Sequence, residues 1–337
     1  MIWANGYSAA YYASVIDPVT WREIGRIEIT GGTVTRADSD LMESARLSCK
    51  NTYQGQEQWI RVIMDTRQDG DFAHVPIFTG LAVSPDRTIE GRFKTDDLSA
   101  YSVLKPADDI ALPKGWYAPV GFVASSIVEQ LLEVIPAPIE TAENSPKLLE
   151  SIVAEKGETN LSMARKVLQA VDWRFRILGD GTVQICPKSR EAVVSFNALD
   201  NDCIEKEVRM SYDWYSCPNI FRATSGDSVA EARDDDPDSI FSTVSRGREI
   251  WKAEENCKLG DGESITEYAY RRLKEEQNAV FKLSYRRRFH PDVLLGDIVE
   301  IHYPEYDLVG NFLVTKQTIT LGFGASTAEE VHGYGSE

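Results

Sequence analysis

The stretch from residue 280 to residue 322 constrains the fold of this chain more than any other. Three runs of residues in it alternate apolar and polar side chains, and turn residues separate these runs. Alternation places one set of side chains on each face of a strand. The stretch therefore predicts a three-stranded antiparallel meander with one buried face.

A similar plan occurs within the first hundred residues. Arg46-Leu47-Ser48 stands where Lys282-Leu283-Ser284 stands in the later stretch. In the same way, residues 59–63 match 297–301, and residues 74–79 match 310–315. The gaps between these blocks differ by only a few residues. The pattern favours a duplicated β domain, and the alternative is a chance likeness between short alternating runs.

The composition limits the classes of protein that fit. A chain of 337 residues can bury a substantial core and divide into two or more domains. Its net charge of −17 argues against stable nucleic-acid binding, which needs clustered Lys and Arg. Apolar runs fall short of the roughly 20 residues that a membrane helix needs. The N-terminus has no signal-peptide pattern, so we expect a cytosolic product without membrane insertion.

Motifs for chemistry are missing from the sequence. It has no nucleophile elbow, P-loop, HExxH or complete EF-hand pattern. Five cysteines are scattered without a CxxC pair, so we expect small buried thiols and neither zinc nor disulfides. They are Cys49, Cys186, Cys203, Cys217 and Cys257. We therefore expect no enzyme activity, no catalytic residue, no cofactor and no bound metal.

The fold class that these patterns predict is α+β and β-dominated, with two antiparallel β domains, each a barrel or a sandwich, and a small inserted α+β domain. In the inserted domain, helices are expected at 123–135, 146–156 and 160–171, followed by a hairpin around Gly179-Asp180-Gly181. A capping box, Ser264 to Glu267, predicts a later helix. The expected boundaries are a first barrel at 1–103 (completed by strands near 190–215), a connector and α+β domain at 104–188, a second barrel at 189–325 with a helix near 264–276, and a flexible tail at 326–337.

Two segments are candidate partner interfaces. Arg286, Arg287, Arg288 and Phe289 form the one sharp basic cluster in an acidic chain. It suits either an edge strand protected by charge or a contact with an acidic neighbour. If it is a contact, changing Arg286 and Arg288 to Glu should block assembly. Trp116-Tyr117 lies in a proline-rich connector, which either packs on its own domain or docks between domains.

Two regions carry a resemblance to a known family. The connector Leu104-Lys-Pro-Ala-Asp-Asp-Ile-Ala-Leu-Pro-Lys-Gly-Trp-Tyr-Ala-Pro resembles the one in PBSX-type baseplate hub proteins of contractile phage tails and phage-derived bacteriocins. Residues 296–304, followed by 310–320, resemble the C-terminal region of that family. The order of domains fits along nearly the whole chain.

The resemblance implies a structural role. Such hubs are homotrimers with two tube-like barrel domains in each subunit, so three subunits present six similar domains in a ring. The ring joins the tail tube protein to the central spike protein, beside other baseplate proteins. A protein of this kind would assemble in the bacterial cytoplasm and reside in the baseplate of a virion or tail-like particle. The alternative is a tail-tip carbohydrate-binding or cell-wall lytic protein, whose candidate carboxylates are Glu129 and Glu133.

Overall fold

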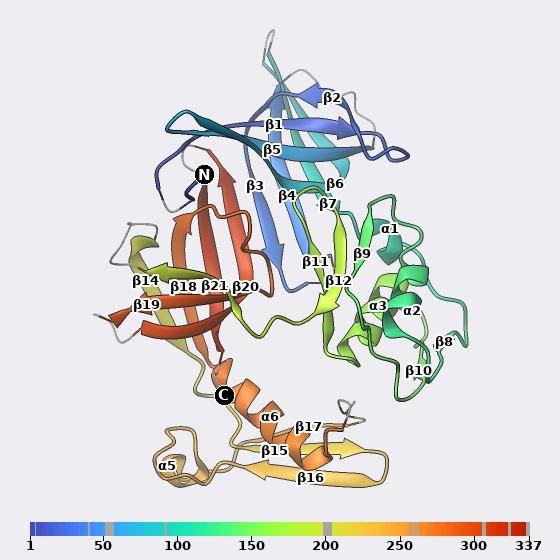
Figure 1. The fold of residues 1–337 in the computed structure, drawn as a ribbon, viewed down its shortest axis with the longest axis vertical. Coiled ribbons are helices and arrows are strands. Elements are labelled where there is room, and N and C mark those ends of the chain that lie inside the picture. The colour runs from blue at the N-terminus through green and yellow to red at the C-terminus, as the bar shows by residue number, and fades with distance from the viewer. Residues whose placement is uncertain are drawn as a thin grey trace.

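The largest element of the fold is one twisted, mainly antiparallel sheet of 13 strands among the described residues (Figure 1). The structure is a computed structural model, and it describes residues 1–3, 5–39, 41–50, 57–90, 93–197, 204–255, 257, 259, 262–304, 308–322 and 325–334. A helical domain packs beside the sheet, and a small sheet with one long helix lies at its lower end. The predicted β-dominated α+β class is confirmed.

The N-terminal β unit contains the first seven strands. In space they follow the order β3-β4-β7-β6-β5-β1-β2. Apolar side chains from alternate positions of these strands fill one core, which includes Leu47, Phe78 and Leu98. The strands are β1 (Ser8–Ile16), β2 (Glu23–Ile27), β3 (Ile29–Ala37), β4 (Glu43–Lys50), β5 (Gln58–Gln68), β6 (Asp71–Glu90) and β7 (Phe93–Ser102).

The C-terminal β unit has the order β14-β18-β21-β20, with β19 on β20 and β13 on β19. Strands β13 and β14 therefore complete this unit, and the expectation that residues 190–215 complete the first one was wrong. The meander is also interrupted, because β21 lies between β18 and β20. The strands are β13 (Ala192–Asn197), β14 (Ile204–Tyr212), β18 (Phe281–Arg288), β19 (Ile298–Tyr303), β20 (Leu308–Leu321) and β21 (Ser326–Tyr334).

The predicted flexible tail is wrong for residues 326–334, and residues 335–337 lie outside the described part. Strand β21 pairs with β18 on one side and β20 on the other. Its inward positions are Thr327, Glu329 and Val331, each at most 1% exposed. Two of these three are polar, so apolar alternation did not reveal the strand.

The two β units share their strand order and part of their pairing register. Val299 pairs with Phe312 and Ile301 with Gly310, as Ile63 pairs with Pro76 and Asp65 with His74. A constant offset of 236 residues (299 − 63 and 312 − 76) relates these pairs. Likewise, Leu283 pairs with Val331 as Leu47 pairs with Leu98. The order β3-β4-β7-β6 thus recurs as β14-β18-β21-β20, which supports duplication.

The units join edge to edge through β20 and β3. Six antiparallel pairs connect these strands, from Lys316 opposite Ala37 to Leu321 opposite Gly32. Val34 and Ile319 face each other in this joint and are fully buried. The sequence did not indicate that the two units form one continuous sheet.

The inserted domain packs helices against short strands. Helix α3 starts at a capped position, because the Thr159 side chain accepts a hydrogen bond from the Ser162 amide. The helix expected at 146–156 is absent, and this stretch contributes β10, which pairs with β8. The elements are α1 (Lys105–Asp108), β8 (Tyr117–Ala118), α2 (Ala124–Leu131), β9 (Ile139–Thr141), β10 (Ile152–Val153), α3 (Asn160–Gln169), β11 (Trp173–Ile177) and β12 (Val183–Pro187).

Residues between β14 and β18 form a separate small layer, whereas the sequence predicts them to be part of the second barrel. The predicted helix is confirmed as α6, with both bonds of the Ser264–Glu267 capping box. It packs on a three-stranded sheet through Phe221, Tyr268 and Leu273. The elements are β15 (Ile220–Ser225), β16 (Ser228–Arg233), α5 (Thr243–Arg246), β17 (Trp251–Glu254) and α6 (Ile265–Asn278). In the described part of the chain, helices are too short or too polar to span a bilayer.

Candidate interface and the joint between the β units

Arg287 belongs to the predicted basic cluster, but its side chain lies inside the molecule and cannot form part of an exposed patch. Strand β18 is flanked by β14 and β21, so it is not an edge strand. The Arg287 side chain is 1% exposed, and its Nε donates to Oε2 of Glu329 at 2.8 Å. Its Nη2 also donates to Oε1 of Glu329. Arg287 therefore neutralises a buried carboxylate of its own chain and is not available to a partner.

Glu329 connects this ion pair to the joint between the units. Gln317 donates from Nε2 to Oε1 of Glu329 at 2.6 Å, and its own Oε1 accepts from Nη1 of Arg36 at 3.1 Å. Gln317 and Arg36 are directly opposed across β20 and β3. Burial opposes ionisation of Glu329, but the charge of Arg287 and the surrounding donors hold the pKa of Glu329 below its usual value. A charged hydrogen-bond chain thus crosses the joint.

The far end of this chain is less well satisfied. Arg36 Nε lies 3.7 Å from Oε2 of Glu43, and both side chains are almost completely buried. Arg36 Nε and Glu43 Oε1 have no hydrogen-bond partner within the described residues. Burial raises the pKa of the Glu43 carboxyl to about 8, against the opposing charge of Arg36. Glu43 is therefore a destabilising feature of the joint at high pH.

The hairpin of β11 and β12 binds the C-terminal unit through its first strand. Arg174 donates from Nη2 to Oδ1 of Asp297 at 2.6 Å, and Arg176 donates from Nη2 to Oδ2 of Asp297 at 3.2 Å. Arg174 also donates from Nη1 to the Leu295 carbonyl at 3.0 Å. Asp297 is 1% exposed. Two arginines on one carboxylate make strong, oriented hydrogen bonds.

The tip of the same hairpin binds the N-terminal unit. Thr79 Oγ1 donates to the Gly179 carbonyl at 2.8 Å, while Arg61 Nη2 (2.8 Å) and Trp21 Nε1 (3.1 Å) donate to the Asp180 carbonyl. A Cβ placed on Gly179 would lie 1.9 Å from the Pro76 carbonyl oxygen. The hairpin therefore clamps the two β units together, and the predicted Gly-Asp-Gly turn is its contact point.

The other predicted interface residues have different surroundings. Arg286 is exposed and Arg288 is half-buried. Phe289 is buried in the core of the N-terminal unit, with its ring 6.3 Å from that of Trp3. Phe289 thus joins the two units within the chain, as Arg287 does. Whether Arg286 and Arg288 contact a partner remains a prediction.

Trp116 and Tyr117 also differ in how far their side chains are exposed. Trp116 packs half-buried against the core of the inserted domain. Tyr117 is 55% exposed and lies opposite Val153, which is 63% exposed, across β8 and β10. The connector packs on its own domain and leaves the Tyr117 ring on the surface.

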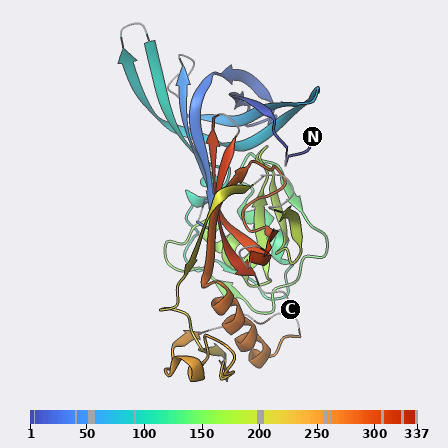
Figure 2. The same cartoon turned by 90° about the vertical axis from the view of Figure 1, so that its left-hand side faces the viewer.

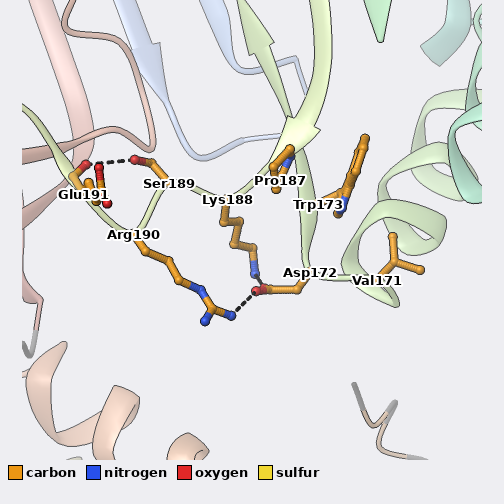
Figure 3. A pocket seen from close by; sticks show the side chains of 8 residues that line it. All are labelled: Val171, Asp172, Trp173, Pro187, Lys188, Ser189, Arg190 and Glu191. Atoms are coloured by element: carbon orange, nitrogen blue, oxygen red, sulfur yellow. Dashed lines mark hydrogen bonds and ion pairs between the residues drawn. The ribbon is translucent and has the colours of Figure 1, made fainter. Parts of the chain in front are cut away.

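One surface hollow is lined partly by charged side chains. An open hollow of about 500 Å³ lies between β11, β12 and the segment after them (Figure 3). Its charged residues neutralise each other, since Lys188 Nζ lies 2.7 Å and Arg190 Nη2 3.9 Å from the Asp172 carboxylate. Among the described residues, the His, Cys, Asp and Glu side chains form no group that could hold a metal ion.

The two candidate carboxylates of the lytic alternative do not share a helix face. Glu129 lies on α2 and accepts a hydrogen bond from Thr141, whereas Glu133 follows the end of the helix. Of the cysteines, Cys49, Cys217 and Cys257 are buried free thiols, as expected. Cys186 is half-buried, and Cys203 lies outside the described residues.

Comparison with known proteins finds similarity in structure only. No protein-family model and no curated protein matches the sequence. A tail protein from Neisseria meningitidis MC58 has a TM-score of 0.68 at 16% identity, and 96% of each chain is covered. The 43 kDa tail protein of prophage MuSo2 from Shewanella oneidensis has a TM-score of 0.66 at 13% identity, over 97% of this chain and 98% of that one.

A third similar structure comes from a secretion system. It is an E. coli protein described as a component of the type VI secretion system with structural similarity to the phage T4 tail proteins gp27 and gp5. Its TM-score is 0.54 at 8% identity, over 92% of this chain and 75% of that chain. At these identities the likeness concerns the fold, and the chain has the fold of phage tail proteins and of a related secretion-system component.

Proposed function

We propose that this protein is a structural baseplate hub of a phage tail or tail-like particle. In this role three copies form a ring of six similar β units that joins the tail tube to the central spike. The observation that carries the proposal is the repeated strand order of the two units, with the same pairing register in part of each. Duplication of this kind lets a threefold assembly offer a sixfold set of surfaces to a tube.

The rigid joint within each chain supports this role. A hub that transmits force between tube and spike needs its two units held in one fixed relation. The β20–β3 pairing, the Glu329–Gln317–Arg36 chain and the β11–β12 clamp all act on that relation. All three sets of contacts connect one β unit to the other, directly or through the inserted hairpin.

The comparisons support the same proposal at the level of the fold. Tail proteins from two bacteria share the fold over almost the whole chain. Partners in this proposal are the tail tube protein, the spike protein and other baseplate proteins. Arg286, with its exposed side chain, remains a proposed contact with one of them, and the protein acts without catalysis or a cofactor.

Measuring the mass of the assembled protein tests the proposal. Native mass spectrometry of the purified full chain should give a species of three times 37.7 kDa. Images of that species should show a ring with six similar lobes. A protein that stays monomeric at all concentrations, or is monomeric within intact tails, would overturn the proposal.

A further inference from the structure

A group of exposed apolar side chains lies where the chain passes from β14 into the small layer that β15, β16, β17, α5 and α6 form. In Figure 2 this layer is the end of the molecule farthest from the N-terminal β unit. The rings of Tyr212 and Trp214 are 6.0 Å apart, and the ring of Trp214 is 6.5 Å from that of Phe241. The aromatic patch, as we call it, consists of five side chains that are each more than half exposed: Tyr212, Trp214, Tyr215, Ile240 and Val244.

The aromatic patch is large for a surface without a partner. Tyr212 is 52% exposed, Trp214 51% and Tyr215 83%. Because an aromatic side chain has about 150–250 Å² to bury, these three leave roughly 400 Å² in contact with water. Monomeric proteins rarely expose apolar patches larger than a few hundred Å², and larger ones mark interaction sites. Tyrosine and tryptophan are also among the residues that contribute most to binding at protein interfaces.

Hydrogen bonds hold the aromatic segment of this patch in one conformation. Arg246 on α5 donates from Nη1 to the Cys217 carbonyl at 2.8 Å and from Nη2 to the Trp214 carbonyl. At the start of the segment, the Asp213 amide donates to the Val280 carbonyl at 3.1 Å. The segment is therefore fixed at both ends. A surface that is already ordered loses little conformational freedom when a partner binds.

Carboxylates border the aromatic patch. Asp213 belongs to the aromatic segment itself and is exposed. Helix α5 lies against the acidic loop that follows β16, because Ser245 Oγ donates to the Pro237 carbonyl at 3.1 Å. Asp236 and Asp238 of this loop are exposed, and neither forms an ion pair with another described residue. The rim of the patch is therefore acidic and complements a cationic partner.

Arginine suits both the rings and the rim of this surface. A guanidinium group stacks on aromatic rings and donates paired hydrogen bonds to carboxylates. The small layer already contains such contacts, since Arg248 lies over the Tyr215 ring at 5.8 Å and Arg222 over the Trp251 ring at 4.9 Å. Nucleic acids and anionic membranes, in contrast, are repelled by an acidic rim.

We propose that the aromatic patch binds a segment of another protein that presents arginine side chains between apolar ones. In this contact the apolar side chains of the partner cover Trp214 and Tyr215. The partner's arginines pair with the carboxylates of the rim, which are Asp213, Asp236 and Asp238. The inference concerns one surface of a single chain, so it does not depend on the trimeric ring of the proposed function.

Peptide binding to the purified full chain tests the proposal. The probes are two fluorescent peptides of equal length, one alternating arginine with leucine and the other alternating glutamate with leucine. Fluorescence anisotropy at physiological ionic strength should show binding of the arginine peptide only. Trp214→Ala should weaken this binding about thirtyfold, as expected for a residue at the centre of an interface. Tyr215→Ala should weaken it too, and because Tyr215 is 83% exposed this second variant should fold normally.

Matched control variants lie in the N-terminal β unit. Phe72→Ala removes a ring that is 48% exposed on β6. Asp69→Asn combined with Asp71→Asn removes two exposed carboxylates close to that ring in the chain. Neither change should alter binding of the arginine peptide. Asp236→Asn combined with Asp238→Asn, in contrast, should weaken it about five- to tenfold.

The outcomes separate this proposal from its rivals. If the control variants weaken binding as much as the patch variants do, the peptide responds to overall charge and the proposal is wrong. The proposal is also wrong if the arginine peptide does not bind, or if no variant affects its binding. Binding of a chito-oligosaccharide in its place, lost in Trp214→Ala, would assign the patch to glycans and overturn the proposal. A chain that binds the peptide as expected but stays monomeric refutes only the ring.

Discussion

Replacing Gly179 by Ala tests the clamp between the two β units. Gly179 does not have a positive φ, so alanine is compatible with its backbone conformation. The obstacle is steric, because the added Cβ would lie 1.9 Å from the Pro76 carbonyl oxygen, a backbone atom that cannot rotate away. The hairpin tip must therefore move off the N-terminal unit.

The size of the effect follows from the bonds that the movement breaks. Three hydrogen bonds hold the tip, from Thr79, Arg61 and Trp21. At about 1 kcal/mol each, their loss should cost about 3 kcal/mol of unfolding free energy. Alanine restricts the unfolded chain and returns about 0.4–1 kcal/mol. The expected net destabilisation is about 2–3 kcal/mol.

Urea unfolding followed by tryptophan fluorescence measures this difference. Trp21 lies at the contact, with its ring 5.6 Å from that of Trp59, so the tip contributes to the fluorescence signal. Gly6→Ala is the matched control, because a Cβ on Gly6 meets no atom within 4 Å. If the two variants unfold at the same urea concentration, the hairpin tip does not clamp the units.

Two further predictions concern the buried charges. Arg287→Met leaves the Glu329 carboxylate buried without its cation and should cost about 3–5 kcal/mol at neutral pH; the deficit should shrink as the pH falls, because Glu329 then takes up a proton, and a deficit independent of pH would refute this account. Glu43→Gln should remove a pH dependence of stability. The pKa of Glu43 is about 8 in the folded state against an ordinary 4.5, so Glu43 keeps its proton there while the unfolded chain loses it. The wild type should therefore lose stability as the pH rises from about 4.5 to about 8, and the variant should not. Thermal unfolding of both proteins across this pH range measures the effect. If the midpoint temperatures of the two proteins change with pH in parallel, the account is wrong.

The sequence predicted the local elements better than their partners. Alternation located most strands of both units, and the capping box located α6, because these signals depend on neighbouring residues only. Ser145 before Pro146 is a favourable helix start and predicts the helix at 146–156. In the structure, pairing of Ile152 and Val153 with β8 outweighs that local preference. The role of Arg287 was also hidden, because its partner Glu329 is 42 residues away and pairing depends on the strand order.

The sequence nevertheless contained a signal for β21. Residues 96–101 are Asp-Asp-Leu-Ser-Ala-Tyr and residues 329–334 are Glu-Glu-Val-His-Gly-Tyr, two acidic residues before an aliphatic one with a tyrosine three positions later. The structure places Asp96 opposite Cys49 and Glu329 opposite Tyr285, at equivalent positions of the two units, and each acid is 1% exposed. A buried carboxylate is costly unless it is paired. Its recurrence at one register position is therefore stronger support for duplication than a shared run of apolar residues, which any two strands can show.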